Sequence, residues 1–116
     1  MCANGLKMPF IPSHITGFTS ILTLVNRVVW EKAVDKQLAR VPNAIAQKFF
    51  FWASLIEEVG IQAVRKQKGF HDEPLKGTRR GQRSVRLNRS YRAIYIQREN
   101  GELELIEVLE VNKHDY

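Results

Sequence analysis

Basic residues are concentrated between Lys76 and Arg92, a stretch with seven lysines and arginines and no acidic residue. The planar guanidinium group of arginine binds a phosphate through two of its N–H groups and stays charged at physiological pH. Much of the stretch also alternates as β-strands do, as in RSVRLN and YRAIYI. These residue types therefore indicate a sheet whose arginines hold an anion.

Two of these arginines are expected to face each other. If residues 88–90 form a three-residue turn, Arg86 lies opposite Arg92 across the hairpin. Like charges that face each other lower the stability of a sheet, so their presence indicates an anion bound between them.

The last strand is predicted to bring the final residues to the same place. Asn100 and Gly101 both tolerate the positive φ angles of a type I′ turn, which predicts a hairpin centred on them. In that register Arg92 faces Leu109, and the extended strand carries residues 114–116 back toward the first turn.

Composition limits the classes of protein and partner. A length of 116 residues with 44% hydrophobic residues suits one domain, residues 1–116, with a packed core; residues 1–26 form an N-terminal extension of unassigned role. The net charge of +6 favours a nucleic acid, an acidic protein or an anionic membrane surface as partner. The lone Cys2 allows no internal disulfide and no thiolate zinc cluster, so we expect no metal and no cofactor.

Hydrophobic spacing predicts the elements that position the basic residues. It indicates an α+β domain of order β-α-α-β-β-β, with two to three helices on a mostly antiparallel four-stranded sheet. The predicted elements are a strand at 27–30, helices at 31–42, 42–60 and, shorter, 61–70, a loop at 71–82, and three strands after it. In the second helix the predicted buried stripe is Ile45, Phe49, Trp52, Ile56 and Val59. The aromatic run at 49–52 extends beyond this stripe, so it is either core or a partner surface.

The segments EPLKG, GQRSVRLNRSYRAIYI and IEVLEVNKHDY resemble the RelE/YoeB/HigB group of bacterial toxins, in the RelE/ParE superfamily. The resemblance covers residues 28–116 and is strongest from Glu73 onward. It implies the toxin of a type II toxin–antitoxin pair, a cytoplasmic ribosome-dependent endoribonuclease, or mRNA interferase, that inhibits translation. The implied partners are the ribosome, messenger RNA and a cognate antitoxin with a helix-turn-helix DNA-binding domain.

The same resemblance implies site residues. Matched position by position, the glutamate of the EPLK loop is Glu73, the strand arginine is Arg92, and the terminal aromatic residue is Tyr116. The tail departs from the family pattern, because His114 stands one place early and Asp115 occupies the place of the usual histidine.

Metal-free RNA cleavage needs a base for the 2′-hydroxyl, an acid for the leaving 5′-oxygen, and cations for the charge of the transition state. Glu73 is the candidate base, His114 the candidate acid or base, and Tyr116 can stack on a nucleobase or transfer a proton. Arg86 and Arg92 are the candidate cations, whereas His71 is expected to be solvent-exposed rather than catalytic, although it lies close to Glu73 in the loop. Further basic residues are expected to contact RNA phosphates, namely Lys66, Lys68, Lys76, Arg79, Arg80, Arg83 and Lys113.

Two other functions stay open. A ParE-like inhibitor of DNA gyrase would use the same fold without acid–base residues, and a basic nucleic-acid-binding module would be harmless when expressed alone. The tail NKHDY, rich in titratable groups, favours the nuclease.

Overall fold

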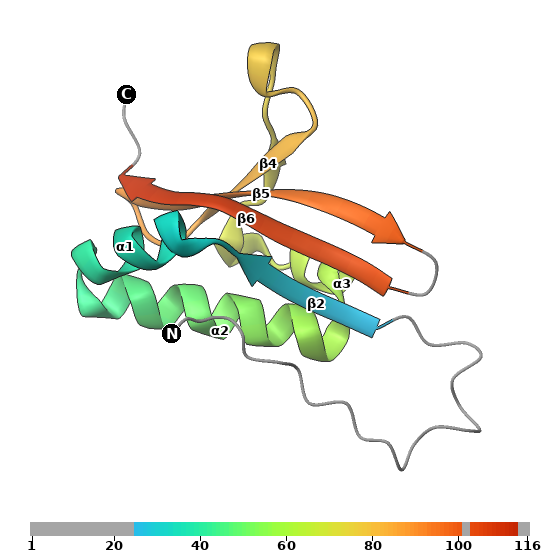
Figure 1. The fold of residues 1–116 in the computed structure, drawn as a ribbon, viewed down its shortest axis with the longest axis horizontal. Coiled ribbons are helices and arrows are strands. Elements are labelled where there is room, and N and C mark those ends of the chain that lie inside the picture. Colours follow the sequence, from blue (N-terminus) through green and yellow to red (C-terminus); the bar gives the residue numbers. More distant parts are fainter. Residues whose placement is uncertain (1–24, 101–102, 114–116) are drawn as a thin grey trace.

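The computed structural model describes residues 25–100 and 103–113, which form a five-stranded sheet with its helices packed on one face (Figure 1). The strand order is β2-β6-β5-β4-β3; β2 pairs with β6 in parallel, and the other neighbouring strands pair antiparallel. The strands are β2 (Val25–Trp30), β3 (Glu73–Pro74), β4 (Gln82–Arg86), β5 (Tyr91–Asn100) and β6 (Leu103–Lys113). The helices are α1 (Lys32–Arg40), α2 (Asn43–Val59) and α3 (Ile61–Arg65), with 3-10 turns η3 (Lys68–Phe70) and η4 (Gly77–Arg79).

The predicted α+β class and order of elements are confirmed, but the sheet has a fifth strand where a loop was predicted. Glu73 and Pro74 pair with Ser84 and Arg83 at the outer edge of β4. The backbone N–H of Leu75 extends this pairing by donating to the carbonyl of Gln82 at 2.9 Å. A two-residue strand has no sequence periodicity of its own, because it is defined by its partner.

Helices α1 and α2 lie where the sequence indicates, whereas the third helix, predicted at 61–70, ends at Arg65 and is followed by the separate turn η3. Val41 is extended, with φ −81° and ψ 161°, because the residue before a proline disfavours the helical region. Helix α2 ends at Gly60, which adopts a φ of 90° while its N–H donates to the carbonyl of Ile56 at 2.8 Å. Within the described residues, no helix is long and apolar enough to cross a bilayer.

The core lies between the helices and the covered face of the sheet. Four residues of the predicted stripe are buried, namely Ile45, Phe49, Trp52 and Ile56. Val59 was predicted with them but is 49% exposed, because it is the last residue of α2 and extends past the packed layer. The aromatic run is divided in the same way, since Phe49 and Trp52 are buried whereas Phe50 and Phe51 are exposed.

The register of the first hairpin is confirmed and that of the second is wrong. Arg86 lies opposite Arg92, as predicted. Arg92, however, faces Asn112 rather than Leu109 on β6. The difference has two causes: Asn100 itself pairs, with Leu103, and β6 contains one extra residue at a bulge opposite Ile94 and Tyr95.

Candidate active site

A pocket of about 200 Å³ opens where β4, β5 and the turn between them meet the segment that leads into β3. Its lining is almost entirely polar and includes three of the predicted catalytic residues, Glu73, Arg86 and Arg92. The full set is His71, Glu73, Ser84, Arg86, Asn88, Arg89, Tyr91 and Arg92.

Strand alternation separates the pocket from the core. On β4, Ser84 and Arg86 line the pocket, whereas Val85 between them is buried in the core. On β5, Arg92 lines the pocket, and its neighbour Ala93 is buried opposite Val85. Arg86 and Arg92 therefore line the same pocket and are cross-strand partners, as predicted.

The turn between β4 and β5 is held by hydrogen bonds among its own residues. The side-chain carbonyl oxygen of Asn88 accepts hydrogen bonds from the backbone N–H groups of Ser90 and Tyr91, at 2.7 Å and 2.8 Å. The N–H of Leu87 donates to the carbonyl of Tyr91 at 2.9 Å. This arrangement places Arg89, which was not predicted as a site residue, in the pocket wall.

His71 also lines the pocket, in addition to being exposed as predicted. Its Nε2 lies 3.8 Å from Oε1 of Glu73. Its backbone is left-handed, with φ 47° and ψ 55°. Among the described residues other than glycine, His71 alone has a positive φ. The available sequence signal was its position two residues before Glu73, since such residues share a face of an extended segment.

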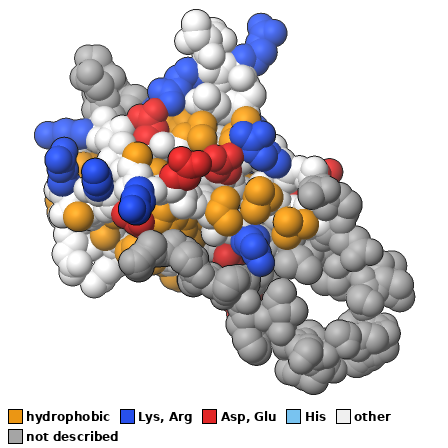
Figure 2. Space-filling model, viewed as in Figure 1, with side chains coloured by type: hydrophobic (Ala, Val, Ile, Leu, Met, Phe, Trp, Pro, Cys, Tyr) orange, Lys and Arg blue, Asp and Glu red, His pale blue; other side chains and the backbone are white. Residues whose placement is uncertain are grey.

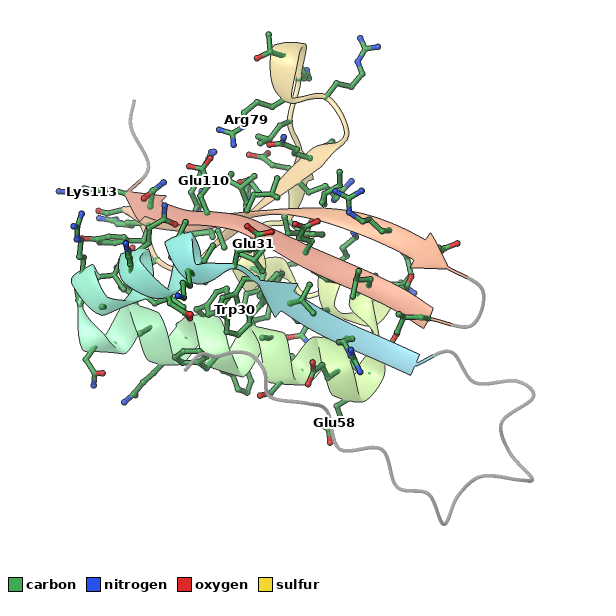
Figure 3. The ribbon with its side chains drawn as sticks, in the orientation of Figure 1. Trp30, Glu31, Glu58, Arg79, Glu110 and Lys113 are labelled. Carbon is green, nitrogen blue, oxygen red and sulfur yellow. The ribbon has the colours of Figure 1, made fainter. Side chains whose placement is uncertain are left out.

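Two of the predicted RNA contacts are engaged with acidic side chains. Arg79 donates to Oε2 of Glu110 on β6, toward which it points in Figure 3, and to Gln82 at 2.8 Å. Arg83 donates to Asp72 at 2.6 Å. The other predicted RNA contacts within the described residues are exposed, namely Lys66, Lys68, Lys76, Arg80 and Lys113.

The face shown in Figure 2 is not uniformly basic. Acidic side chains gather in its middle beside apolar ones, and basic side chains stand around them and on the projecting segment between β3 and β4. Glu110 is one of the acidic groups there (Figure 3). Basic and acidic side chains are therefore mixed on this face, whereas the pocket lining has three arginines and one glutamate.

We expect the Arg79–Glu110 pair to make stability depend on pH. The hydrogen bond from Arg79 lowers the pKa of Glu110 below its ordinary value, against the opposing effect of burial. A lowered pKa means that the stabilisation is present above the ordinary pKa and is lost as the pH falls through the folded-state pKa. Glu110→Gln should therefore cost up to about 1 kcal/mol near pH 7 and less near pH 3. Urea unfolding at the two pH values measures this; equal costs at both would contradict it.

The predicted tail residues His114 and Tyr116, with Asp115 between them, lie outside the described residues. The described end of β6 is next to the pocket, because Lys113 pairs with Tyr91 of the pocket wall.

The pocket groups can supply complementary chemistry. Two cross-strand arginines suit the charge of a phosphate, and a carboxylate beside an imidazole suits proton transfer near neutral pH. Such a set matches attack on a phosphodiester more closely than it matches a neutral ligand.

Searches by sequence find no matching protein-family model and no matching curated protein. Solved structures do match. RelE in the archaeal RelE–RelB complex from Pyrococcus horikoshii is 28% identical with a TM-score of 0.57, over 78% of this chain and 96% of that one. The YoeB/ParE toxin from Agrobacterium tumefaciens is 20% identical with a TM-score of 0.60, over 77% and 99%. The match to the E. coli DinJ–YafQ toxin–antitoxin complex is 14% identical with a TM-score of 0.61, over 78% and 94%. The chain therefore has the fold of the RelE, YoeB and YafQ toxins of toxin–antitoxin systems.

Proposed function

We propose that the chain is the toxin of a type II toxin–antitoxin system and acts as a ribosome-dependent endoribonuclease that inhibits translation. The observation that carries the proposal is the pocket itself, where Arg86 and Arg92 face each other beside Glu73 and His71. Like-charged partners on neighbouring strands lower stability unless an anion is bound there, so the pair indicates a phosphate site.

The proposed reaction needs no metal. Glu73 takes the proton of the 2′-hydroxyl, whose oxygen attacks the adjacent phosphorus, and the bond from phosphorus to the 5′-oxygen breaks. The products are a 2′,3′-cyclic phosphate and a 5′-hydroxyl that receives a proton from an acid. His71, at the pocket, and His114, in the tail, are the candidate acids. Arg86 and Arg92 stabilise the charge that develops on the phosphate oxygens.

The proposed partners follow from the same comparison. The similar RelE and YafQ structures were solved as complexes with RelB and DinJ. We propose a cognate antitoxin for this chain as well, with a helix-turn-helix DNA-binding domain, and the cytoplasm as the place where toxin, ribosome and messenger RNA meet.

Expression of the wild-type chain without antitoxin is expected to stop translation, with messages cut inside ribosome-bound regions. Purified protein should cut messenger RNA on programmed ribosomes and leave 2′,3′-cyclic phosphate ends, detected by their resistance to 3′-end ligation until the cyclic phosphate is opened and the phosphate removed. The same RNA without ribosomes is the control and should stay intact. Uncleaved messenger RNA together with gyrase-dependent DNA breaks would instead support the gyrase inhibitor. Normal growth on expression would support a binding module.

A further inference from the structure

Asp72 stands between the two exposed pocket residues His71 and Glu73, yet it is buried on the other side of the chain. Its side chain is 2% exposed, whereas those of His71 and Glu73 are 53% and 51% exposed. Burying a carboxylate costs free energy unless each oxygen has a hydrogen-bond partner, so Asp72 is expected to have a partner for both oxygens.

Both carboxylate oxygens of Asp72 accept hydrogen bonds from strands of the sheet. Nε of Arg83 on β4 donates to Oδ1 at 2.6 Å, and the hydroxyl of Tyr95 on β5 donates to Oδ2 at 2.5 Å. Arg65 of α3 adds a second positive charge, with its Nε 3.8 Å from Oδ1. Burial, together with the hydrogen bond to Asp72, raises the pKa of Tyr95, so its hydroxyl stays protonated as a donor.

The contacts of Asp72 with Arg83 and Tyr95, called here the Asp72 anchor, determine where Glu73 points. Neighbouring residues of an extended segment point to opposite sides, and β4 shows the same alternation, with Arg83 beside Asp72 and Ser84 in the pocket. Glu73 pairs with Ser84. Attaching Asp72 to Arg83 on one side therefore directs the carboxylate of Glu73 to the pocket side.

The anchor also accounts for the backbone of His71. A left-handed conformation costs a residue with a side chain about 1–2 kcal/mol, so it persists only where the surroundings impose it. His71 lies between two buried neighbours, Phe70 and Asp72, and its N–H donates to the carbonyl of Lys68 at 3.0 Å. The buried side chains of Phe70 and Asp72 therefore hold His71 in its strained conformation beside the pocket.

We infer that Asp72 is a positioning residue, which fixes His71 and Glu73 at the pocket through its contacts with Arg83 and Tyr95. Asp72 does not line the pocket, so it acts on the reaction only through its two neighbours. The catalytic consequence rests on the proposed function, whereas the structural consequence does not.

The first test measures single-turnover cleavage of ribosome-bound message by Asp72→Asn, which keeps the side-chain shape and removes the charge that Arg83 pairs with. We expect cleavage to slow by about tenfold to a hundredfold with unchanged ribosome binding, because a small misplacement of a reacting group has an effect of this size. In a protein that already carries His71→Ala and Glu73→Gln, adding Asp72→Asn should change nothing further. The same additional slowing in that background, or full activity of Asp72→Asn alone, would overturn the inference.

The second test uses amide hydrogen exchange of the free protein and needs no activity. Asp72→Asn should speed exchange of the Leu75 amide, which holds the segment to Gln82, and leave unchanged the Val111 amide of β6, which donates to the side chain of Gln37. The matched control is Glu107→Gln, which removes a partly exposed carboxylate from its pair with Arg98 and should affect neither amide. Unchanged exchange at Leu75, or equal acceleration at Val111, would refute the positioning role. If the wild-type chain cut no message, the proposed function would fail while this measurement still decided the role of Asp72.

Discussion

Replacing Arg92 by alanine is expected to slow cleavage of ribosome-bound message by about a hundredfold to a thousandfold and to abolish toxicity, while the fold survives. Arg92 lines the pocket opposite Arg86, and in the proposed mechanism it stabilises charge on the phosphate. The free protein should become slightly more stable, by about 0.2–1 kcal/mol, because the substitution removes one of two like charges that face each other. Growth arrest, single-turnover cleavage and urea unfolding measure the three effects.

Arg98→Ala is the matched control for this variant. Arg98 lies on the same strand and the same face as Arg92, but it donates to Glu107 at 2.9 Å and does not line the pocket. We expect normal toxicity and cleavage from it. Undiminished killing by Arg92→Ala would remove Arg92 from the mechanism, and equal losses in both variants would point to general attraction of RNA rather than a defined site.

Trp52→Ala is expected to lower the free energy of unfolding by about 3–5 kcal/mol, the usual cost of deleting a large aromatic side chain from a core. Trp52 is fully buried, and its ring lies 5.9 Å from that of Phe49 and 5.4 Å from that of Tyr95. Small domains have total stabilities of about 5–15 kcal/mol, so this variant should be partly unfolded at growth temperature and poorly toxic. Urea unfolding followed by circular dichroism gives the midpoint.

Trp52→Phe tests the contribution of the aromatic ring separately from that of the indole N–H. The buried Nε1 of Trp52 has no hydrogen-bond partner within the described residues, and phenylalanine keeps an aromatic ring without that N–H. Removing an unsatisfied donor offsets part of the lost packing, so we expect a cost below about 1.5 kcal/mol. A cost as large as that of alanine would show that the indole fills space that a smaller ring cannot fill.

The fold was predictable wherever a local pattern repeats. Helical spacing located α1 and α2, and strand alternation located β4, β5 and β6, because these patterns reflect which side of an element is buried. The pairing of β5 with β6 was not predictable beyond the turn. The bulge opposite Ile94 and Tyr95 adds a residue to one strand only, and nothing local in an alternating sequence marks it.

The site was predictable in its charges and not in its geometry. Arg86 and Arg92 were expected from residue type and Glu73 from the family resemblance, and all three line the pocket. His71 was not expected there, because its left-handed backbone depends on buried neighbours that only the folded chain provides. Arg79 and Arg83 were expected to contact RNA because the sequence does not reveal their acidic partners. Glu110 is 31 positions from Arg79, and Asp72, the partner of Arg83, lies in the predicted loop.

The parallel pairing of β2 with β6 affects how the protein is made. Val25 pairs with Leu103, 78 positions later, so β2 has no partner in the sheet until β6 has been synthesised. Contacts this distant in sequence form late and slow folding. A ribosome producing the chain therefore carries an incomplete sheet until β6 has been synthesised.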